Sequence, residues 1–165
     1  KMAKKTAKKI EKKPGSIPEN APPGLFINAQ YLKDLSFENP NPIDAYQTTE
    51  KPDIKVDINT TVKKLPNNSF EVTLDIKTEA KKKEKVAFIA EVSYAGIFTL
   101  NKIPPEQEKP LLLIEAPRML FPFARNVLAE TTRDGGYPPL MLNPIDFSTL
   151  YQKQMASQQQ NQKKS

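Results

Sequence analysis

The sequence predicts an α+β fold: a four-stranded antiparallel sheet with one crossover connection, backed by one long helix and a shorter C-terminal helix. Residues 25–100 alternate between apolar and polar side chains, which is typical of a sheet with one buried face. Residues beyond 110 instead repeat apolar side chains three or four apart, as an amphipathic helix does. The length of 165 residues suits one domain.

Four segments carry the strand pattern. Residues 54–62 and 70–77 alternate strictly, and sheets of this kind are usually antiparallel. Residues 85–100 are apolar on both sides, which predicts a central or covered strand. Residues 65–68 and 80–84 are natural hairpin turns, whereas the proline-rich connection from Glu38 to Asp53 predicts a crossover. The first segment places these side chains on its apolar side: Leu25, Ile27, Ala29, Tyr31, Leu35 and Phe37.

Two helices are expected in the second half. Pro117 fits the first turn of a helix, where its missing N–H costs nothing, and Gly135-Gly136 ends that helix sharply. Asp146 can cap a last helix that begins at Phe147. The long helix carries an apolar stripe made of Leu120, Phe121, Ala124, Val127 and Leu128.

Composition excludes several classes of function. The chain has no Cys and no His, so thiolate nucleophiles, imidazole bases and most zinc sites are excluded. The net charge of +6 resides in the ends: residues 1–20 hold seven Lys and residues 151–165 hold three. We expect a disordered Lys-rich tail over 1–24, a folded domain over 25–155 and a disordered Gln-rich tail over 156–165. With neither a signal segment nor a bilayer-length apolar run, we expect a cytoplasmic protein.

Carboxylates gather on the polar side of the predicted strands, at Asp34, Glu38, Asp57, Glu71, Asp75 and Glu91. Three interpretations are open: an ordinary solvated face, an acidic docking surface for a basic partner, or an active-site carboxylate pair. The last is the least supported, because no pattern in the sequence predicts a concave pocket.

A second set of side chains is apolar and lies in the crossover and the last helix. These residues are Ile43, Tyr46, Phe147, Leu150, Tyr151 and Met155. They could complete the core, or they could line a groove for extended apolar segments. Several shallow apolar subsites filled together would bind an unfolded chain without sequence specificity.

Four motifs together resemble the SecB family of protein-export chaperones. They are YLKDLSFENPNPI (31–43), AFIAEVSYAGIF (87–98), APRMLFPFARNVL (116–128) and GGYPPLMLNPIDFSTLY (135–151). The resemblance covers residues 25–155 and implies an ATP-independent holdase that is not an enzyme and needs no cofactor or metal. Such a protein binds unfolded preproteins and delivers them to the ATPase SecA.

The resemblance also implies partners and site residues. SecA would dock on Asp34, Glu38, Ile89 and Glu91, and also through its own zinc-bearing basic tail. Clients would occupy the groove lined by Ile43 and Tyr46 of the crossover and by Phe147, Leu150, Tyr151 and Met155 of the last helix. The family forms a homotetramer, a dimer of dimers, so the stripe of the long helix is expected at the interface between copies. Neither binding to nucleic acid nor membrane insertion is expected.

Two alternatives remain open within these observations. A chaperone of the same fold could serve a single labile client, such as an antitoxin. A protein of another class could bind nucleic acid through the lysine-rich tail. The overall charge departs from the family pattern, because family members are typically acidic and this chain is basic through its tails.

Overall fold

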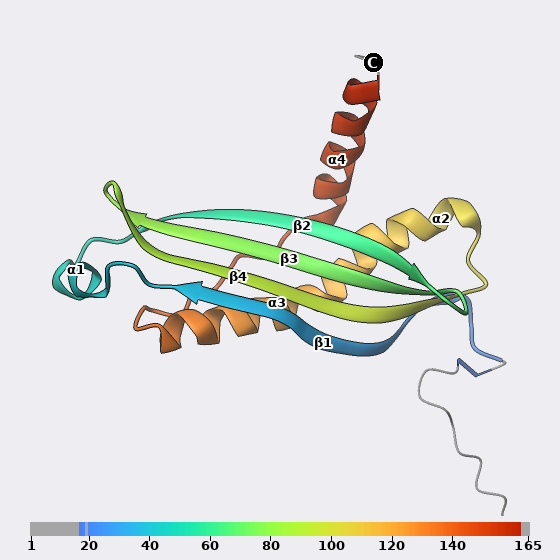
Figure 1. Ribbon diagram of the computed structural model, residues 1–165. Helices are drawn as coiled ribbons and strands as arrows, with labels where there is room; N and C mark the ends of the chain where they lie inside the picture. The colour runs from blue at the N-terminus through green and yellow to red at the C-terminus, as the bar shows by residue number, and fades with distance from the viewer. Residues whose placement is uncertain (1–16, 19, 163–165) are drawn as a thin grey trace, which may run out of the picture.

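The computed structural model describes residues 17–18 and 20–162 and shows one sheet with its long helical segment on a single face (Figure 1). The prediction of an α+β fold with a four-stranded antiparallel sheet, a long helix and a C-terminal helix is confirmed. Most of the predicted Lys-rich tail, residues 1–16 and 19, lies outside the described residues. The elements in chain order are β1 (Gly24–Glu38), α1 (Pro42–Gln47), β2 (Asp53–Leu65), β3 (Ser69–Lys82), β4 (Lys85–Asn101), α2 (Pro105–Pro110), the π-helical η1 (Leu111–Glu115), α3 (Ala116–Asp134) and α4 (Phe147–Gln162).

The strand order is β1-β4-β3-β2, so β1 and β2 are the two edges of the sheet. The crossover predicted between Glu38 and Asp53 therefore spans the full width of the sheet and carries α1. The predicted hairpin between β2 and β3 is confirmed, and Asn67 and Asn68 take positive φ values of 58° and 54° there. Asn tolerates this conformation better than most residues do, which explains its use in the turn.

The core lies between the inner face of the sheet and α3. Phe88, Val92 and Phe98 of β4 are at most 2% exposed, and α3 packs on β4, β3 and β1. Gly96 allows this close approach, because a Cβ there would lie 3.0 Å from Leu120 and 2.7 Å from the Phe98 ring. The prediction that this strand is central is confirmed.

Strand β1 departs from simple alternation because it contains two bulges. Its register with β4 shifts between Ile27 and Ala29 and again between Leu32 and Asp34. Each bulge inserts one unpaired residue and so exchanges the two faces for the residues that follow. Ala29 and Tyr31 are therefore on the outer face, away from the helices, and the prediction that they belong to the apolar side was wrong.

The long helical segment begins earlier than predicted. It runs without interruption from Pro105 through η1 to Asp134, whereas the sequence suggested a new helix at Pro117. Immediately before that proline the turn widens, and the Ala116 N–H bonds the carbonyl of Leu111, five residues back. A widened turn is a known accommodation of proline, which lacks an N–H and crowds the carbonyl four residues before it.

The predicted end of the long helix at Gly135-Gly136 is confirmed. Gly136 has a φ of +91°, and the N–H of Tyr137 bonds the carbonyl of Thr132 at 3.1 Å while that of Gly136 bonds Arg133 at 3.0 Å. These two bonds are the Schellman arrangement, which needs a residue that accepts positive φ. Gly135 serves packing instead, because a Cβ there would lie 2.3 Å from the Phe37 ring.

Helix α4 begins as predicted but ends later. The Asp146 carboxylate accepts hydrogen bonds from the Thr149 N–H at 3.1 Å and the Thr149 hydroxyl at 2.8 Å, so it caps the first turn. The helix continues to Gln162, inside the segment 156–165 where the sequence suggested a disordered tail. Gln, Ala and Lys favour helix, and neither Gly nor Pro interrupts this stretch. No helix within 17–18 and 20–162 has the length and apolar character needed to cross a membrane.

The first bulge has a chemical consequence on the outer face. The Tyr31 hydroxyl donates to Glu71 at 2.5 Å, and the Lys33 ammonium donates to the same carboxylate at 2.7 Å. The bond from Lys33, followed by that from Tyr31, lowers the pKa of Glu71. The bond to Glu71, with burial, raises the pKa of Tyr31 to about 12. These contacts tie the edge strand β1 across β4 to β3.

We predict that Glu71→Gln returns the pKa of Tyr31 toward its usual 10, because the negative acceptor that favours the neutral phenol is lost. Phenolate absorbance during an alkaline titration measures this shift, and Asp75→Asn, on the same strand, is the control. Because the pKa of Glu71 is lowered, its contribution to stability is present above 4.5 and is lost as the pH falls through the lowered value. An identical titration of wild type and Glu71→Gln would contradict the assignment.

Candidate functional site

The inner face of the edge strand β2 is only partly covered. Its apolar side chains Ile54, Val56 and Val62 are 39%, 38% and 38% exposed, whereas the equivalent residues of β3 are buried. The helix α3 lies on the other three strands, and of the helical segments η1 makes the main contacts with β2. An apolar strip therefore stays open to water along this edge of the sheet, which is unusual for a chain that forms its own core.

A hollow of about 470 Å³ lies at one end of this strip. Residues 48–52 of the crossover form one wall, residues 136–140 after α3 form the other, and Ile54 of β2 contributes to the floor. Most of these residues belong to loops held against rigid elements, an arrangement common in binding sites. The hollow has the size and composition to accept apolar side chains of an extended peptide.

An aromatic cluster forms the back of the hollow. Phe88 lies 4.8 Å from Tyr137 and 5.7 Å from Phe37, measured between ring centroids. The Tyr137 hydroxyl lies 2.8 Å from both the Asn39 side-chain oxygen and the Ala87 carbonyl, to which it can donate. Burial raises the pKa of Tyr137, so the hydroxyl stays neutral and this aromatic part of the lining is uncharged. Phe88 is 2% exposed and supports the cluster, so the half-buried Tyr137 is the ring of this cluster that can contact an apolar ligand.

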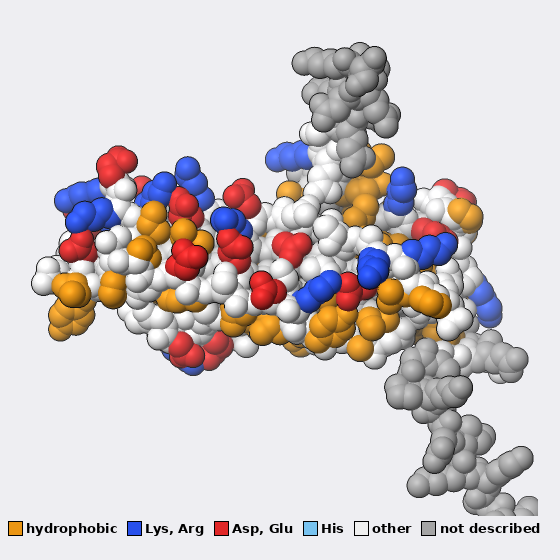
Figure 2. Space-filling model, viewed as in Figure 1, with side chains coloured by type: hydrophobic (Ala, Val, Ile, Leu, Met, Phe, Trp, Pro, Cys, Tyr) orange, Lys and Arg blue, Asp and Glu red, His pale blue; other side chains and the backbone are white. Residues whose placement is uncertain are grey.

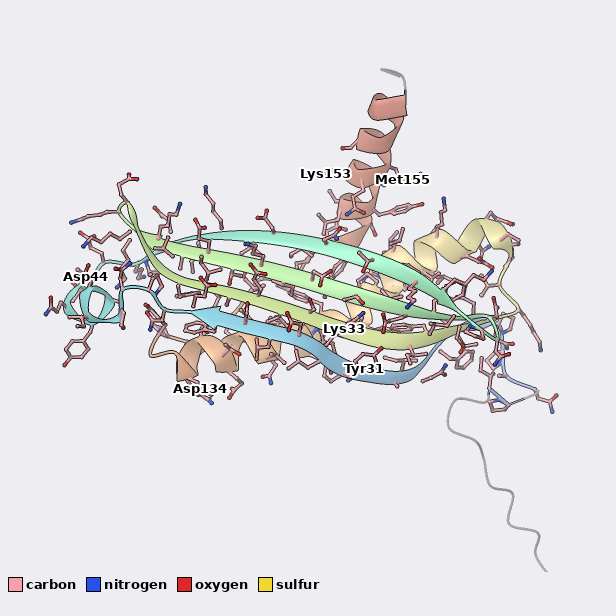
Figure 3. All side chains as sticks on the ribbon, viewed as in Figure 1. Tyr31, Lys33, Asp44, Asp134, Lys153 and Met155 are labelled. Atoms are coloured by element: carbon pink, nitrogen blue, oxygen red, sulfur yellow. The ribbon has the colours of Figure 1, made fainter. Side chains whose placement is uncertain are left out.

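A second hollow of about 540 Å³ lies further along β2, where α4 leaves the sheet. Figure 3 shows α4 projecting beyond the β2 edge with Lys153 and Met155 on it. The lining comprises Ile58, Asn59 and Thr60 of β2 together with Leu150, Lys153, Gln154 and Ser157 of α4. The two hollows and the exposed strip between them form one path, which we call the β2 groove.

The structure assigns the predicted groove residues to different environments. Leu150 lines the second hollow, and Tyr151 and Met155 are half-buried on α4 outside both hollows. Ile43 and Tyr46 protrude from α1, where they are 71% and 92% exposed and outside the lining of both hollows.

Phe147 requires a correction. The sequence offered it as a groove residue, but its side chain is 2% exposed and packs edge-on against Phe121 with the ring centroids 6.0 Å apart. It belongs to the core because the cap at Asp146 points the first turn of α4 toward α3. A buried side chain of this kind anchors the helix and cannot touch a client directly.

The four residues predicted to face SecA come together on the outer face of the sheet. Glu38 lies opposite Ile89 in the pairing of β1 with β4, Glu91 lies opposite Ser36, and Asp34 lies opposite Ser93. They occupy three consecutive rungs on the same face, which we call the outer patch. Figure 2 shows this face of the sheet covered by interspersed acidic and basic side chains. The two bulges of β1 restore Asp34 and Glu38 to this side.

A lysine partly neutralises the negative charge of the outer patch. Lys77 of β3 lies 2.6 Å from the Glu91 carboxylate, and this contact raises the pKa of Lys77. Both side chains are about half exposed, at 55% and 46%, so water screens the pair and its contribution is small. Asp34 and Glu38 are exposed, and neither belongs to any ion pair found within the described residues.

The apolar stripe of α3 also requires a correction. Leu120, Ala124 and Leu128 are 0% exposed and Phe121 is 6% exposed, because they pack on the sheet of the same chain. Val127 is half-buried beside them. Leu120, Phe121, Ala124 and Leu128 form the core of one subunit, so the expectation that they meet other copies was wrong for these four. For the half-buried Val127 it stays a prediction.

A different apolar surface of α3 is free within the chain. Met119 and Phe123 are 39% and 46% exposed, and Phe123 stacks on Tyr94 with the ring centroids 6.1 Å apart. Leu32 and Leu35 of β1 are 44% and 40% exposed on the same side of the sheet. Together they form the α3–β1 patch, and hydrophobic side chains are visible beneath β1 in Figure 2.

Sequence reasoning missed the floor and one wall of the groove. Ile54 and Val56 were recognised as apolar strand residues, but only the strand order shows that they lie at an open edge. The wall at residues 136–140 begins at the glycine pair predicted to end the long helix, and no pattern in its sequence indicated a role in binding. Of the described residues, no cluster of acidic side chains could hold a metal ion.

Comparisons with known proteins agree with this architecture. The family model of the preprotein translocase subunit SecB matches residues 18–158. The Protein-export protein SecB of Afipia carboxidovorans is 48% identical over 146 residues, which cover 88% of this chain and 91% of that protein. The Protein-export protein SecB of Rhodospirillum centenum is 47% identical over 164 residues, covering 97% of this chain and 96% of that one.

A solved structure shows the same fold at low sequence identity. It is a SecB-like chaperone of Mycobacterium tuberculosis in complex with a peptide from the HigA1 antitoxin, with a TM-score of 0.60 and 15% identity. The match covers 73% of this chain and 90% of that chain. Because the family model spans most of the sequence and the relatives align over nearly their whole length, the chain belongs to the SecB family of protein-export chaperones.

Proposed function

We propose that the β2 groove is where this export chaperone holds unfolded preproteins. The observation that carries the proposal is the open stretch of β2 from Ile54 to Thr60, with hollows of about 470 and 540 Å³ at its two ends. Extended segments of a client lie along the strip and place apolar side chains in the hollows. The protruding Ile43 and Tyr46, 71% and 92% exposed, extend the apolar contact at the crossover end.

The mechanism is mass action and needs neither catalysis nor ATP. A groove that accepts only extended segments binds the unfolded client and not the folded one, so it lowers the free concentration of unfolded chain. Each buried apolar side chain contributes about 1.5–3 kcal/mol, and several weak contacts on one client add to a useful affinity. The groove therefore slows folding and aggregation without recognising a particular sequence.

Delivery to SecA is assigned to the outer patch of Asp34, Glu38, Ile89 and Glu91. Two free carboxylates beside one half-buried apolar side chain suit a basic partner with an apolar anchor. The patch is on the face opposite the core, so client and SecA can bind at the same time. We place the complex in the cytoplasm, where unfolded preproteins and SecA meet.

Assembly into a homotetramer is assigned to the α3–β1 patch. Met119, Phe123, Leu32 and Leu35 expose apolar surface that a second copy would cover. A patch shared by a helix and an edge strand suits an interface between identical copies.

A dedicated single client is the second candidate within the same fold. The M. tuberculosis neighbour was solved with an antitoxin peptide, but at 15% identity it supports the fold and not the client. Relatives near 48% identity carry the export name, which favours general export. Binding of nucleic acid would depend on residues 1–16, which lie outside the described part.

For the groove, we expect Ile54→Thr with Val56→Thr to weaken capture of an unfolded preprotein about tenfold, because apolar contact with the client is lost. The folded state should be unaffected, since both side chains are exposed and Thr favours strands. Retardation of folding of a slow-folding preprotein measures the effect. Val62→Thr, on the same face but outside both hollows, is the control; equal loss in that variant would place the groove elsewhere.

For SecA docking, Asp34→Asn with Glu38→Gln should lower the affinity for purified SecA about tenfold at low salt, with the difference shrinking as salt screens the charges. Client capture should be unchanged. Asp53→Asn with Asp57→Asn removes the same charge from the outer side of β2 and should have little effect. A loss as large in that control pair would show a nonspecific charge effect.

For assembly, Phe123→Asp should lower the molecular mass in solution from four chains to fewer, because a charge replaces an apolar contact between copies. Sedimentation equilibrium measures the mass. Met141→Asp changes a side chain that is 61% exposed and is not one of the patch residues, and it should leave the mass unchanged. A variant that stays tetrameric would reject this interface.

A further inference from the structure

The crossover helix α1 is held in place almost without apolar packing. None of its residues is buried, and its two large apolar side chains, Ile43 and Tyr46, point into solvent. The hydrogen bonds and the ion pair that connect it to the rest of the chain go to the hairpin between β3 and β4. At its start, the Asn41 amide donates to the Val86 carbonyl at 2.9 Å. The position of this segment therefore depends on hydrogen bonds and charge rather than on the hydrophobic effect.

Lys82, at the end of β3, makes the densest of these contacts. Its ammonium donates to the carbonyl of Ala45 at 3.2 Å, to the carbonyl of Thr48 at 3.1 Å and to the Thr48 hydroxyl at 3.3 Å. All three acceptors lie in the last turn of α1 or at its C-cap. A helix leaves its last carbonyls unpaired, and a cation there satisfies them and opposes the negative end of the helix dipole.

Two neighbouring lysines add weaker contacts. Lys85 lies 2.5 Å from the Asp44 carboxylate, and Lys83 lies 3.4 Å from Glu50. Their side chains are 69% and 77% exposed, so water screens both pairs strongly. Lys82 is half-buried and has three acceptors, so it makes the dominant contact. We call Lys82 and Lys85, whose partners lie in α1 or at its C-cap, the lysine clasp, whereas Lys83 pairs with Glu50 beyond α1.

The lysine clasp adjoins the β2 groove. Lys82 lines the hollow of about 470 Å³ and also a hollow of about 380 Å³ between α1 and the hairpin. The crossover residues 48–52, which form a wall of the groove, follow directly after the turn that Lys82 holds. Figure 3 shows Asp44 on α1 at the end of the sheet, beside the hairpin. Movement of α1 away from the hairpin would open that wall.

We propose that Lys82 is a positioning residue for client binding: by holding the last turn of α1 it keeps the wall of the β2 groove closed over a bound segment. The inference rests on the proposed groove. The crossover then acts as a flap whose closure depends on charge. A client is retained while the clasp holds and is released faster when it loosens.

The dependence of the client dissociation rate on salt distinguishes this proposal from apolar binding alone. Apolar contact is not weakened by salt, and excluded salts strengthen it. Salt does screen the helix dipole and exposed ion pairs. An uncharged client should therefore dissociate faster from the wild-type protein as salt rises, opposite to the trend for apolar binding alone.

The test compares Lys82→Gln, Lys82→Arg and the control Lys83→Gln in the full-length chain. The probe is an uncharged, unfolded peptide rich in Leu and Phe, and stopped-flow fluorescence gives its dissociation rate at low and high potassium chloride. We expect Lys82→Gln to speed dissociation about fivefold at low salt, the scale of one ordinary hydrogen bond, because Lys82 is only half-buried, and to remove the salt dependence. Lys82→Arg should retain most of both properties, and Lys83→Gln should resemble wild type.

Hydrogen exchange of residues 44–52 supplies a second readout. Faster exchange there in Lys82→Gln, with an unchanged melting temperature, would show that the flap and not the fold has loosened. Equal dissociation rates, salt dependence and exchange in wild type and Lys82→Gln would overturn the inference while leaving the groove intact. If the Ile54→Thr and Val56→Thr variant also binds the peptide as wild type does, the groove itself is misplaced.

Discussion

A single layer of helix must cover a sheet that is wider than a helix, and this mismatch organises the rest of the structure. Four strands spaced about 4.8 Å apart span more than the roughly 10 Å width of one helix. Helix α3 lies on β4, β3 and β1, where Gly96 and Leu120 allow the closest approach. Apolar surface is left bare at both edges: the β2 groove on one side and the α3–β1 patch on the other. Client binding and assembly are both assigned to surface that the core cannot cover.

The charged character of the outer face follows from the two-residue period with which strand side chains alternate between faces. Alternation sends apolar side chains to the helices and charged ones to solvent, so a docking surface for a basic partner is separated from the client groove by the thickness of the sheet. The two bulges of β1 adjust this pattern locally. They turn Tyr31 outward to bond Glu71 and then return Asp34 and Glu38 to the outer side. The surfaces proposed for partner docking and client capture thus lie on opposite faces of the sheet.

The sequence predicted most of the fold and less of the site, for physical reasons. Alternation identified the strands, Gly135-Gly136 and Asp146 marked helix ends, and the proline-rich connection indicated the crossover, because these signals are local. The groove depends on which strand lies at an edge, which is a tertiary property that periodicity does not contain. The stripe from Leu120 to Leu128 was correctly identified as apolar, but periodicity cannot say whether its partner is the chain's own sheet or another copy.

The open edge of β2 has one more consequence. An edge strand offers unpaired backbone groups to any extended chain, including a second β2. In the antiparallel register that would match two such strands over their full length, with residue 53 opposite 65, Lys55 of each copy faces Lys63 of the other. Like charges directly opposite one another are unfavourable. The spacing of these two lysines therefore opposes pairing between the β2 edges of two copies. This edge stays exposed because the proposed client groove runs along it.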